Sequence, residues 1–342
     1  MNELKGKRVI LIEPTDKIDS QFRLYKESGC DFSVGPYVSE VGKAYSADQL
    51  IALGNEYDAI IGMSRDKFTG EILSKCERVQ MIGKTGIGVD HIDLAAAADK
   101  GILVTNTPGN HELDVAEYAV GEMLLLLKGY ARLDAKVRGG GWRDSSTTGG
   151  ELYEHIVGLV GYGAIGRHVA KRLQGWDCKI LAYDPNISQE QCDAFGYSIK
   201  MTDWETLFRE SDIVSLHLPL NDKTKGCVGK KEFQLMKKSA YIINTSRGQL
   251  LDLAAMDEAL SNKEIAGAAV DTHVKEPAGP DYPLLKYDNV ILTPHCAGWA
   301  YGGLARIAEH AARNTIEALS GKPPVNTVNP DAIPLWRKRF GY

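Results

Sequence analysis

The sequence predicts an α/β protein of two domains, each built on a parallel sheet. Short apolar strands alternate with helical segments along nearly the whole chain, which is the pattern of parallel sheets. The length of 342 residues suffices for two domains of ordinary size. A glycine turn in mid-chain, Gly161–Gly166, separates a strand from a helix and indicates what one of the domains binds.

The glycine turn has the full order of a dinucleotide site. An apolar strand is expected over 156–160, the turn Gly161-Tyr-Gly163-Ala-Ile-Gly166 follows, then a helix with an apolar face, then a strand that ends at Asp184. Gly161 makes the tight turn, Gly163 lets backbone N–H groups approach a pyrophosphate, and Gly166 lets the helix pack close to the strand. The pyrophosphate then lies at the helix N-terminus, where N–H groups and the helix dipole favour an anion.

The acid at the end of the second strand indicates which dinucleotide is bound. Asp184 can accept hydrogen bonds from the adenosine ribose hydroxyls. A 2′-phosphate would meet this negative charge, and Pro185 and Asn186 offer it no cation. We therefore predict NAD rather than NADP, bound by a Rossmann-like domain.

Composition excludes several classes of protein. The formal charge of -5 and the lack of a Lys/Arg-rich run argue against a nucleic-acid partner. The apolar run near 123–127 is too short for a membrane span, and the N-terminus is too poor in apolar residues for a signal peptide. The six cysteines show no CxxC, so we expect reduced thiols, no metal site and a cytoplasmic location. Cys296 lies beside His295, but nothing in the sequence indicates a catalytic thiol.

The N-terminal part predicts a small parallel sheet without a dinucleotide site. Strands are expected over 8–13, 31–34, 57–63, 79–82 and 102–106, with helix-like or mixed segments between them. A glycine-rich loop, Gly83–Asp90, directly follows one strand. Its consecutive N–H groups could bind a carboxylate, or the loop could be a flexible turn, and the residues alone favour neither.

The remaining elements continue the alternation. A long helix is expected over 114–136, and its apolar stripe suits a subunit interface or a core equally well. Strands are expected over 212–218, 240–244, 266–270 and 290–292, and a last helix over 299–319, before an extended, proline-rich tail. We expect this C-terminal helix to return to the N-terminal sheet.

Residues with complementary chemistry follow three of the predicted strands. These residues are Arg247, Glu276 and His295. Ligands of open parallel sheets bind outside the carboxyl ends of the strands. A guanidinium can hold a carboxylate with two hydrogen bonds, a histidine can transfer a proton near neutral pH, and a carboxylate can orient that histidine. Each residue alone could be structural, but together, beside a nucleotide turn, they predict reduction of a 2-keto acid.

The chain resembles the D-isomer-specific 2-hydroxyacid dehydrogenase family over almost its whole length, in the branch of the phosphoglycerate and hydroxypyruvate dehydrogenases. Seven motifs in family order carry this resemblance: GIGVDHIDL at Gly86–Leu94, VAEYAVGEML at Val115–Leu124, GLVGYGAIG at Gly158–Gly166, HLPL at His217–Leu220, INTSRG at Ile243–Gly248, AVDTHVKEP at Ala269–Pro277 and TPHCAG at Thr293–Gly298.

The resemblance implies a role for each matching residue. Arg247, Glu276 and His295 take the catalytic places, and Ile87, Gly88, Arg247 and His295 bind the substrate. The residues implied to contact NAD are Gly161, Gly163, Ala164, Ile165, Gly166, Asp184, Pro185, His217, Pro219, Thr224, Thr245, Ser246, Asp271 and Gly298. It also implies a flavodoxin-like substrate domain of residues 1–104 and 298–342, an NAD-binding domain of residues 105–297, a cleft between them, and a homodimer formed through the helices near Val115.

The resemblance leaves the substrate open. Glu276 stands where formate dehydrogenases have a glutamine, so formate is disfavoured. Ser64 and Arg65 resemble the phosphate-side loop of phosphoglycerate dehydrogenases, but Met63 and Lys84 stand where arginines are common. We expect a small 2-keto acid, with D-3-phosphoglycerate dehydrogenase or an NAD-sensing binding protein as alternatives. No added regulatory domain is expected. Trp299 and Tyr301 are expected either at the substrate pocket or in the core.

Overall fold

The computed structural model describes residues 4–14, 19–35, 44–63 and 65–342. Ser64, which resembles part of the phosphate-side loop of phosphoglycerate dehydrogenases, lies outside them. The chain divides into two compact units, Met1–His111 with Ala300–Tyr342, and Glu112–Trp299. Each unit contains one sheet whose paired strands are all parallel, which confirms the predicted α/β class with two parallel sheets.

The first unit is built on a five-stranded sheet of order β2-β1-β3-β4-β5. This is the order of flavodoxin-like sheets, and its direction reverses between β1 and β3, the switch point where such sheets bind ligands. The strands are β1 (Arg8–Leu11), β2 (Asp31–Val34), β3 (Ala59–Gly62), β4 (Met81–Lys84) and β5 (Leu103–Thr105). The helices between them are α1 (Asp19–Ser28), α2 (Ala47–Glu56), α3 (Gly70–Ser74) and α4 (Leu94–Asp99).

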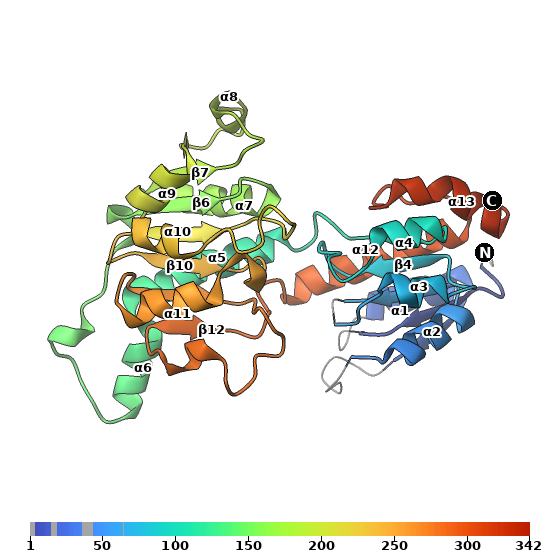
Figure 1. The fold of residues 1–342 in the computed structure, drawn as a ribbon, viewed down its shortest axis with the longest axis horizontal. Coiled ribbons are helices and arrows are strands. Elements are labelled where there is room, and N and C mark those ends of the chain that lie inside the picture. The colour runs from blue at the N-terminus through green and yellow to red at the C-terminus, as the bar shows by residue number, and fades with distance from the viewer. Residues whose placement is uncertain (1–3, 15–18, 36–43, 64) are drawn as a thin grey trace. The chain divides into compact units, whose positions relative to one another are not determined.

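The C-terminal segment completes this unit. Helix α12 (Tyr301–Leu319) packs beside α1 and β4, and its Ala311 and Leu319 are buried in one cluster with Val9 and Leu11 of β1. In Figure 1 the orange-red helix α12 lies with the blue and cyan elements of the same unit. The predicted return of the C-terminal helix to the N-terminal sheet is therefore observed.

The extended tail was expected over 321–330, where the structure has no helix or strand before the turn at Pro330, but the helix that follows was not predicted. Helix α13 (Ile333–Phe340) follows a short 3-10 turn, η7 (Pro330–Ala332). Its Trp336 is fully buried in the core of the first unit, and Ile333 and Phe340 pack against the same cluster. The apolar residues thus recur at helical spacing, and burying this face stabilises a helix that the preceding prolines obscure.

The second unit is built on a seven-stranded sheet of order β12-β11-β10-β9-β6-β7-β8. Apart from the additional β12, this is the Rossmann order, and its direction reverses between β6 and β9. The strands are β6 (Ile156–Val160), β7 (Lys179–Tyr183), β8 (Lys200–Met201), β9 (Ile213–Leu216), β10 (Tyr241–Asn244), β11 (Gly267–Val270) and β12 (Val290–Leu292). The helices are α5 (Glu112–Lys128), α6 (Tyr130–Arg138), α7 (Ala164–Leu173), α8 (Gln189–Asp193), α9 (Trp204–Glu210), α10 (Lys230–Leu235) and α11 (Leu253–Ser261).

The single helix expected over 114–136 is two helices. Gly129 separates α5 from α6 and adopts a left-handed conformation, φ 65°, which interrupts the regular helix. Helix α5 packs on α7 and buries its apolar stripe in the core, whereas α6 has no buried residue. Within the described residues, no helix combines the length and apolar content needed to cross a membrane.

Candidate active site

The three glycines of the mid-chain turn differ in the space that a side chain would have at each position. Gly161 has φ 99°, and a Cβ there would lie 2.5 Å from the carbonyl oxygen of His217. A Cβ on Gly166 would lie 2.3 Å from the carbonyl oxygen of Gly161, so the turn and α7 can pack together only without side chains at these positions. A Cβ on Gly163 would meet nothing within 4 Å. This glycine therefore faces open space, which a ligand could fill.

The surroundings of this turn fit a dinucleotide. Gly163 is the N-cap of α7 and no side chain caps the helix, so its first N–H groups are available to an anion. The turn also lies where the strand order reverses, beside the end of β9. Both ring nitrogens of His217 and the hydroxyl of Thr245 are buried without a hydrogen-bond partner among the described residues. Burial lowers the pKa of His217 to about 4, so this ring is neutral at physiological pH.

Asp184 follows β7, next to the glycine turn. Its Oδ2 accepts a hydrogen bond from the Tyr162 N–H at 3.0 Å, and its Oδ1 accepts one from the Asn186 N–H at 2.9 Å. The carboxylate thus fixes the turn itself and keeps further acceptor capacity for ribose hydroxyls. Pro185 beside it is exposed.

His295 and Glu276 form a hydrogen-bonded pair beyond β11 and β12. The Nδ1 of His295 lies 2.9 Å from the Oε2 of Glu276, and both side chains are just over one-third exposed. Burial raises the pKa of Glu276, but the hydrogen bond and charge of His295 and the His273 N–H outweigh it, so the pKa is lowered. His295 has φ 53°, a conformation that is uncommon for a residue other than glycine and clusters at functional sites.

Asp271 holds the loop that carries His295. Its carboxylate, fully buried, accepts hydrogen bonds from the Thr293 hydroxyl and from the N–H groups of Cys296 and Ala297, at 2.6, 2.9 and 2.9 Å. Its carbonyl oxygen accepts from the His295 N–H at 2.7 Å. Asp271 therefore sets the backbone on both sides of His295, whatever it also contacts in a cofactor.

Arg247 follows β10, the neighbouring strand. Its Nη1 donates to the carbonyl of Ser246 at 2.8 Å. A Cβ on the next residue, Gly248, would lie 2.2 Å from the carbonyl carbon of His273, so this loop packs directly on the backbone beyond β11. The loops carrying Arg247, Glu276 and His295 therefore follow three adjacent strands of one sheet.

Several residues implied to contact NAD have structural partners in the chain. The Ser246 hydroxyl donates to the carbonyl of Leu216 at 2.7 Å, and the Thr224 hydroxyl donates to the carbonyl of Pro219 at 2.6 Å. These bonds shape the loops after β9 and β10, beside the glycine turn. Gly298 follows the Asp271-bound residues, in the same unit.

Ile87 and Gly88, the implied carboxylate-binding residues, lie in the first unit after β4. The N–H of Gly86 donates to the Thr107 hydroxyl at 2.8 Å, and the Ile87 carbonyl accepts from the Asn106 amide at 3.0 Å. Gly86 has φ 131°, which only glycine adopts readily. The loop is thus held in a defined turn.

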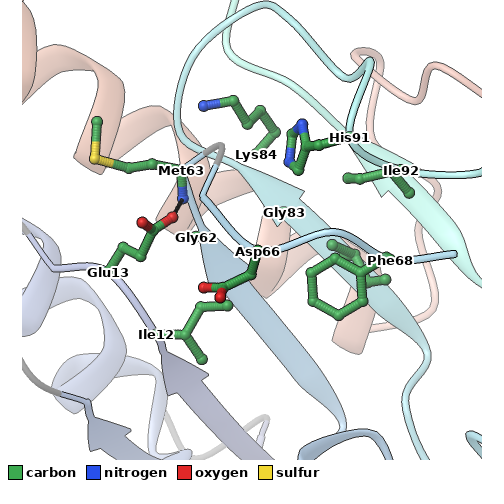
Figure 2. Close-up of a pocket in the computed structure, with 11 residues that line it drawn as sticks. Ile12, Glu13, Gly62, Met63, Asp66, Phe68, Gly83, Lys84, His91 and Ile92 are labelled. Atoms are coloured by element: carbon green, nitrogen blue, oxygen red, sulfur yellow. Dashed lines mark hydrogen bonds between the residues drawn. The ribbon is translucent and has the colours of Figure 1, made fainter. Parts of the chain in front are cut away.

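A pocket opens beside this loop, at the switch point of the first sheet. Figure 2 shows the carboxylates of Glu13 and Asp66 in it, with Lys84 and His91 around them. Its lining residues are Ile12, Glu13, Gly62, Met63, Asp66, Phe68, Ile82, Gly83, Lys84, His91 and Ile92. Glu13 Oε2 accepts from the Met63 N–H at 2.7 Å, and burial raises its pKa despite the neighbouring Arg65.

Arg65 is held by two carboxylates at this pocket. Its Nε lies 3.4 Å from Glu13 Oε1, and its Nη2 lies 3.3 Å from Asp66 Oδ2. Both acids are buried, with exposed fractions of 7% and 2%. The positive charge of Arg65 is therefore matched by negative charge already present.

Trp299 and Tyr301 are exposed, by 44% and 97%. Their placement in the core, one of the two expectations for them, is therefore wrong, because neither side chain is buried. Cys296 shares a hydrogen bond with Tyr118, whose hydroxyl lies 3.3 Å from its sulfur, and burial raises the pKa of the thiol. A thiol with a raised pKa is a poor nucleophile, which agrees with assigning it no catalytic role.

Residues 120–297 match the family model of the D-isomer specific 2-hydroxyacid dehydrogenase, NAD binding domain. A glyoxylate reductase of Thermofilum pendens is 38% identical over 292 residues, which cover 84% of this chain and 86% of that enzyme. The chain belongs to the D-isomer-specific 2-hydroxyacid dehydrogenase family. The predicted family is confirmed, and so is NAD as the cofactor of its nucleotide-binding domain.

A second relative and a solved structure are also similar to this chain. A D-3-phosphoglycerate dehydrogenase of Archaeoglobus fulgidus is 36% identical over 294 residues, which cover 86% of this chain but 55% of that enzyme. The chain thus spans about half the length of this relative. A crystal structure of a protein from Thermus thermophilus has a TM-score of 0.85 at 28% identity, over 94% of this chain and 99% of that one. Members of the family are NAD-dependent oxidoreductases that act on the CH–OH group of 2-hydroxy acids.

Sequence reasoning gave no role to two buried residues of the second unit. His273 lies within the motif AVDTHVKEP, and its side chain is 7% exposed. Glu122 of α5 is 2% exposed, and both its carboxylate oxygens have no hydrogen-bond partner among the described residues. An acid inside the apolar stripe of α5 was the only available signal for Glu122. None was available for His273, whose ring binds the carbonyl of Thr293, 20 residues further along the chain.

Proposed function

We propose that this protein transfers a hydride reversibly between NADH and a small 2-keto acid, as a D-2-hydroxyacid dehydrogenase. The observation that carries the proposal is the His295–Glu276 hydrogen bond of 2.9 Å, on a sheet whose neighbouring strand end carries Arg247. A proton donor with a fixed ring and a guanidinium are the two groups that reduction of a keto acid requires.

The second unit is proposed to bind the cofactor. The free N-terminus of α7 takes the pyrophosphate, Asp184 takes the ribose hydroxyls, and His217, Thr245 and Asp271 line the remaining contacts. Bound NADH supplies the hydride. The NAD-binding domain predicted over 105–297 corresponds to the second unit, and the substrate domain predicted over 1–104 and 298–342 corresponds to the first. The two units themselves divide between His111 and Glu112 and between Trp299 and Ala300.

The chain's own residues supply the rest of the reaction. Arg247 binds the substrate carboxylate and polarises the ketone oxygen, and the family resemblance implies that the Ile87–Gly88 backbone also binds substrate. His295 donates a proton to the ketone oxygen as its negative charge develops. Glu276 keeps the Nδ1 side of the ring occupied, so Nε2 faces the substrate. In the oxidation direction His295 takes the proton back.

The charges at the pocket of the first unit favour an unphosphorylated substrate. A phosphate group usually needs free guanidinium forks, and Arg65 is already paired with Glu13 and Asp66. A phosphate dianion would also approach two buried carboxylates. Glyoxylate, hydroxypyruvate and pyruvate carry no phosphate, so they need no free guanidinium there and bring no phosphate charge towards these carboxylates. The alternative, D-3-phosphoglycerate dehydrogenase activity, is favoured by the relative of that name and opposed by this pairing.

We also propose a cytoplasmic homodimer. Helix α6 buries none of its residues and exposes Tyr130 and Val137, while Trp142 just beyond it is 77% exposed. A second copy of the chain would cover these apolar side chains, because exposed aromatic residues concentrate at subunit interfaces.

The test is NADH oxidation with a panel of glyoxylate, hydroxypyruvate, pyruvate, bulkier apolar keto acids and 3-phosphohydroxypyruvate. We expect turnover with one of the unphosphorylated acids. Preference for 3-phosphohydroxypyruvate would support the phosphoglycerate alternative. NADH binding without turnover on any acid would support an NAD-sensing binding protein instead.

A further inference from the structure

We propose that His273 is a positioning residue that holds the loops of Arg247, Glu276 and His295 in one arrangement. This inference rests on the proposed function, because it concerns the same three residues. His273 follows β11 directly after Asp271 and Thr272, and it contacts the loops beyond both neighbouring strands.

The ring of His273 binds the loop that carries His295. Its Nε2 lies 2.9 Å from the carbonyl oxygen of Thr293, so Nε2 carries the proton and donates it. Its Nδ1 is buried and has no partner among the described residues. The ring stands edge-on to Tyr282, with centroids 5.1 Å apart and planes at 89°. One hydrogen bond and one aromatic contact therefore fix the ring.

The backbone of His273 binds the catalytic acid. Its N–H donates to Glu276 Oε1 at 2.9 Å, while Glu276 Oε2 binds His295. The carboxylate is thus held at both oxygens, and the direction in which it presents Oε2 to His295 depends on where the backbone of His273 lies.

The same backbone supports the arginine loop. Gly248 packs so closely that a Cβ on it would lie 2.2 Å from the carbonyl carbon and 2.6 Å from the carbonyl oxygen of His273. A movement of His273 would therefore displace Gly248 and the adjacent Arg247. His273 touches all three loops, and the Thr293 hydrogen bond is the only one of these contacts that its ring nitrogens make among the described residues.

The direct test compares His273→Phe with His273→Gln. Phenylalanine keeps the ring against Tyr282 but removes the Nε2–H donor, whereas glutamine offers an amide N–H of similar reach. We expect His273→Phe to lower kcat by about 10- to 100-fold, since small displacements of reacting groups cost this much. NADH affinity should be unchanged, the pH at which reduction fails should fall, and His273→Gln should recover much of the rate. Tyr282→Phe is the matched control and should behave like wild type.

A second readout does not depend on turnover. The His295 Nδ1 proton, assigned in the proton NMR spectrum by its absence in His295→Asn, should be protected from exchange in the wild type and lose this protection in His273→Phe. Unchanged exchange together with wild-type kcat in His273→Phe would overturn the inference. If His273→Phe lowered kcat, NADH affinity and the thermal midpoint together, the inference would also be overturned. Such a general loss would indicate a structural role alone. Wild-type protein without turnover but with this exchange difference would refute the proposed function and leave the positioning role supported.

Discussion

The Nδ1 of His295 and the Oε2 of Glu276 are 2.9 Å apart, and His295 makes this contact from a left-handed backbone conformation. The strain is held in place by Asp271, whose carbonyl and carboxylate bind the backbone on both sides of His295. A residue whose backbone is kept in a costly conformation by several contacts is typical of a functional site.

Gly163→Ala should weaken NADH binding without destabilising the protein. A Cβ there meets nothing within 4 Å, so the fold has room for it, but it would keep a pyrophosphate away from the N–H groups of α7. Loss of one such hydrogen bond to a charged group corresponds to about 10-fold in affinity or more. Titration of NADH fluorescence and the thermal midpoint check both parts.

Gly175→Ala is the matched control for this variant. Gly175 also meets nothing within 4 Å, but it lies in the 3-10 turn after α7, away from its N-terminus. NADH affinity should stay at the wild-type value. Equal effects of the two substitutions would contradict the assignment of the glycine turn to the pyrophosphate.

This glycine turn was accessible to sequence reasoning because its chemistry is local. Strand, turn, helix and acid lie within one stretch of chain, and each glycine has a steric reason that a motif encodes. The break at Gly129 was missed because a single glycine is tolerated in many helices. Helix α13 was missed because its stability comes from burying Trp336 in a core cluster with residues that are distant in sequence, such as Val9 and Leu11 of β1.

Asp66→Asn should shift substrate preference towards 3-phosphohydroxypyruvate. The amide oxygen can still accept the Tyr45 N–H that Oδ1 of Asp66 accepts at 2.6 Å, but the negative charge beside Arg65 is lost. The relative kcat/KM for phosphorylated over unphosphorylated acid should rise by about 10-fold, the worth of one charge-assisted bond. An unchanged ratio would show that the pairing of Arg65 does not select the substrate.

The ion pair of Arg65 with Glu13 could not be predicted from the sequence. Arg65 alone resembled a phosphate ligand, and only the fold brings Glu13 of the β1 end to it. The sequence placed Arg247, Glu276 and His295 at three strand ends. It gave no sign of His273, whose contacts join residues from three separate loops.

Glu122→Gln should stabilise the protein at neutral and alkaline pH. Burial, and then the charge of Asp271, raise the pKa of Glu122 to about 8. Because the pKa of Glu122 is higher in the folded than in the unfolded chain, its protonated carboxyl contributes fully to stability below the unfolded pKa. This contribution declines as the pH rises above the unfolded pKa, and it is lost once the pH passes about 8. Glutamine cannot ionise, so the gain at pH above 8 should be on the order of a few kcal/mol.

Urea unfolding across pH measures this effect, with Glu117→Gln as the control on the same helix. Glu117 is 67% exposed and pairs with Arg172, so its replacement should change the free energy of unfolding little at any pH. If wild type and Glu122→Gln show the same pH dependence, Glu122 is not a proton-binding group of the native state.

The variant His295→Asn decides whether His295 is the proton donor in keto-acid reduction. Steady-state NADH oxidation with the best acid of the panel should fall by about 10²- to 10⁴-fold, the usual contribution of a general acid. The NADH dissociation constant, measured on the same preparation, should not change. Retained turnover in His295→Asn, with NADH bound as in the wild type, would contradict the account.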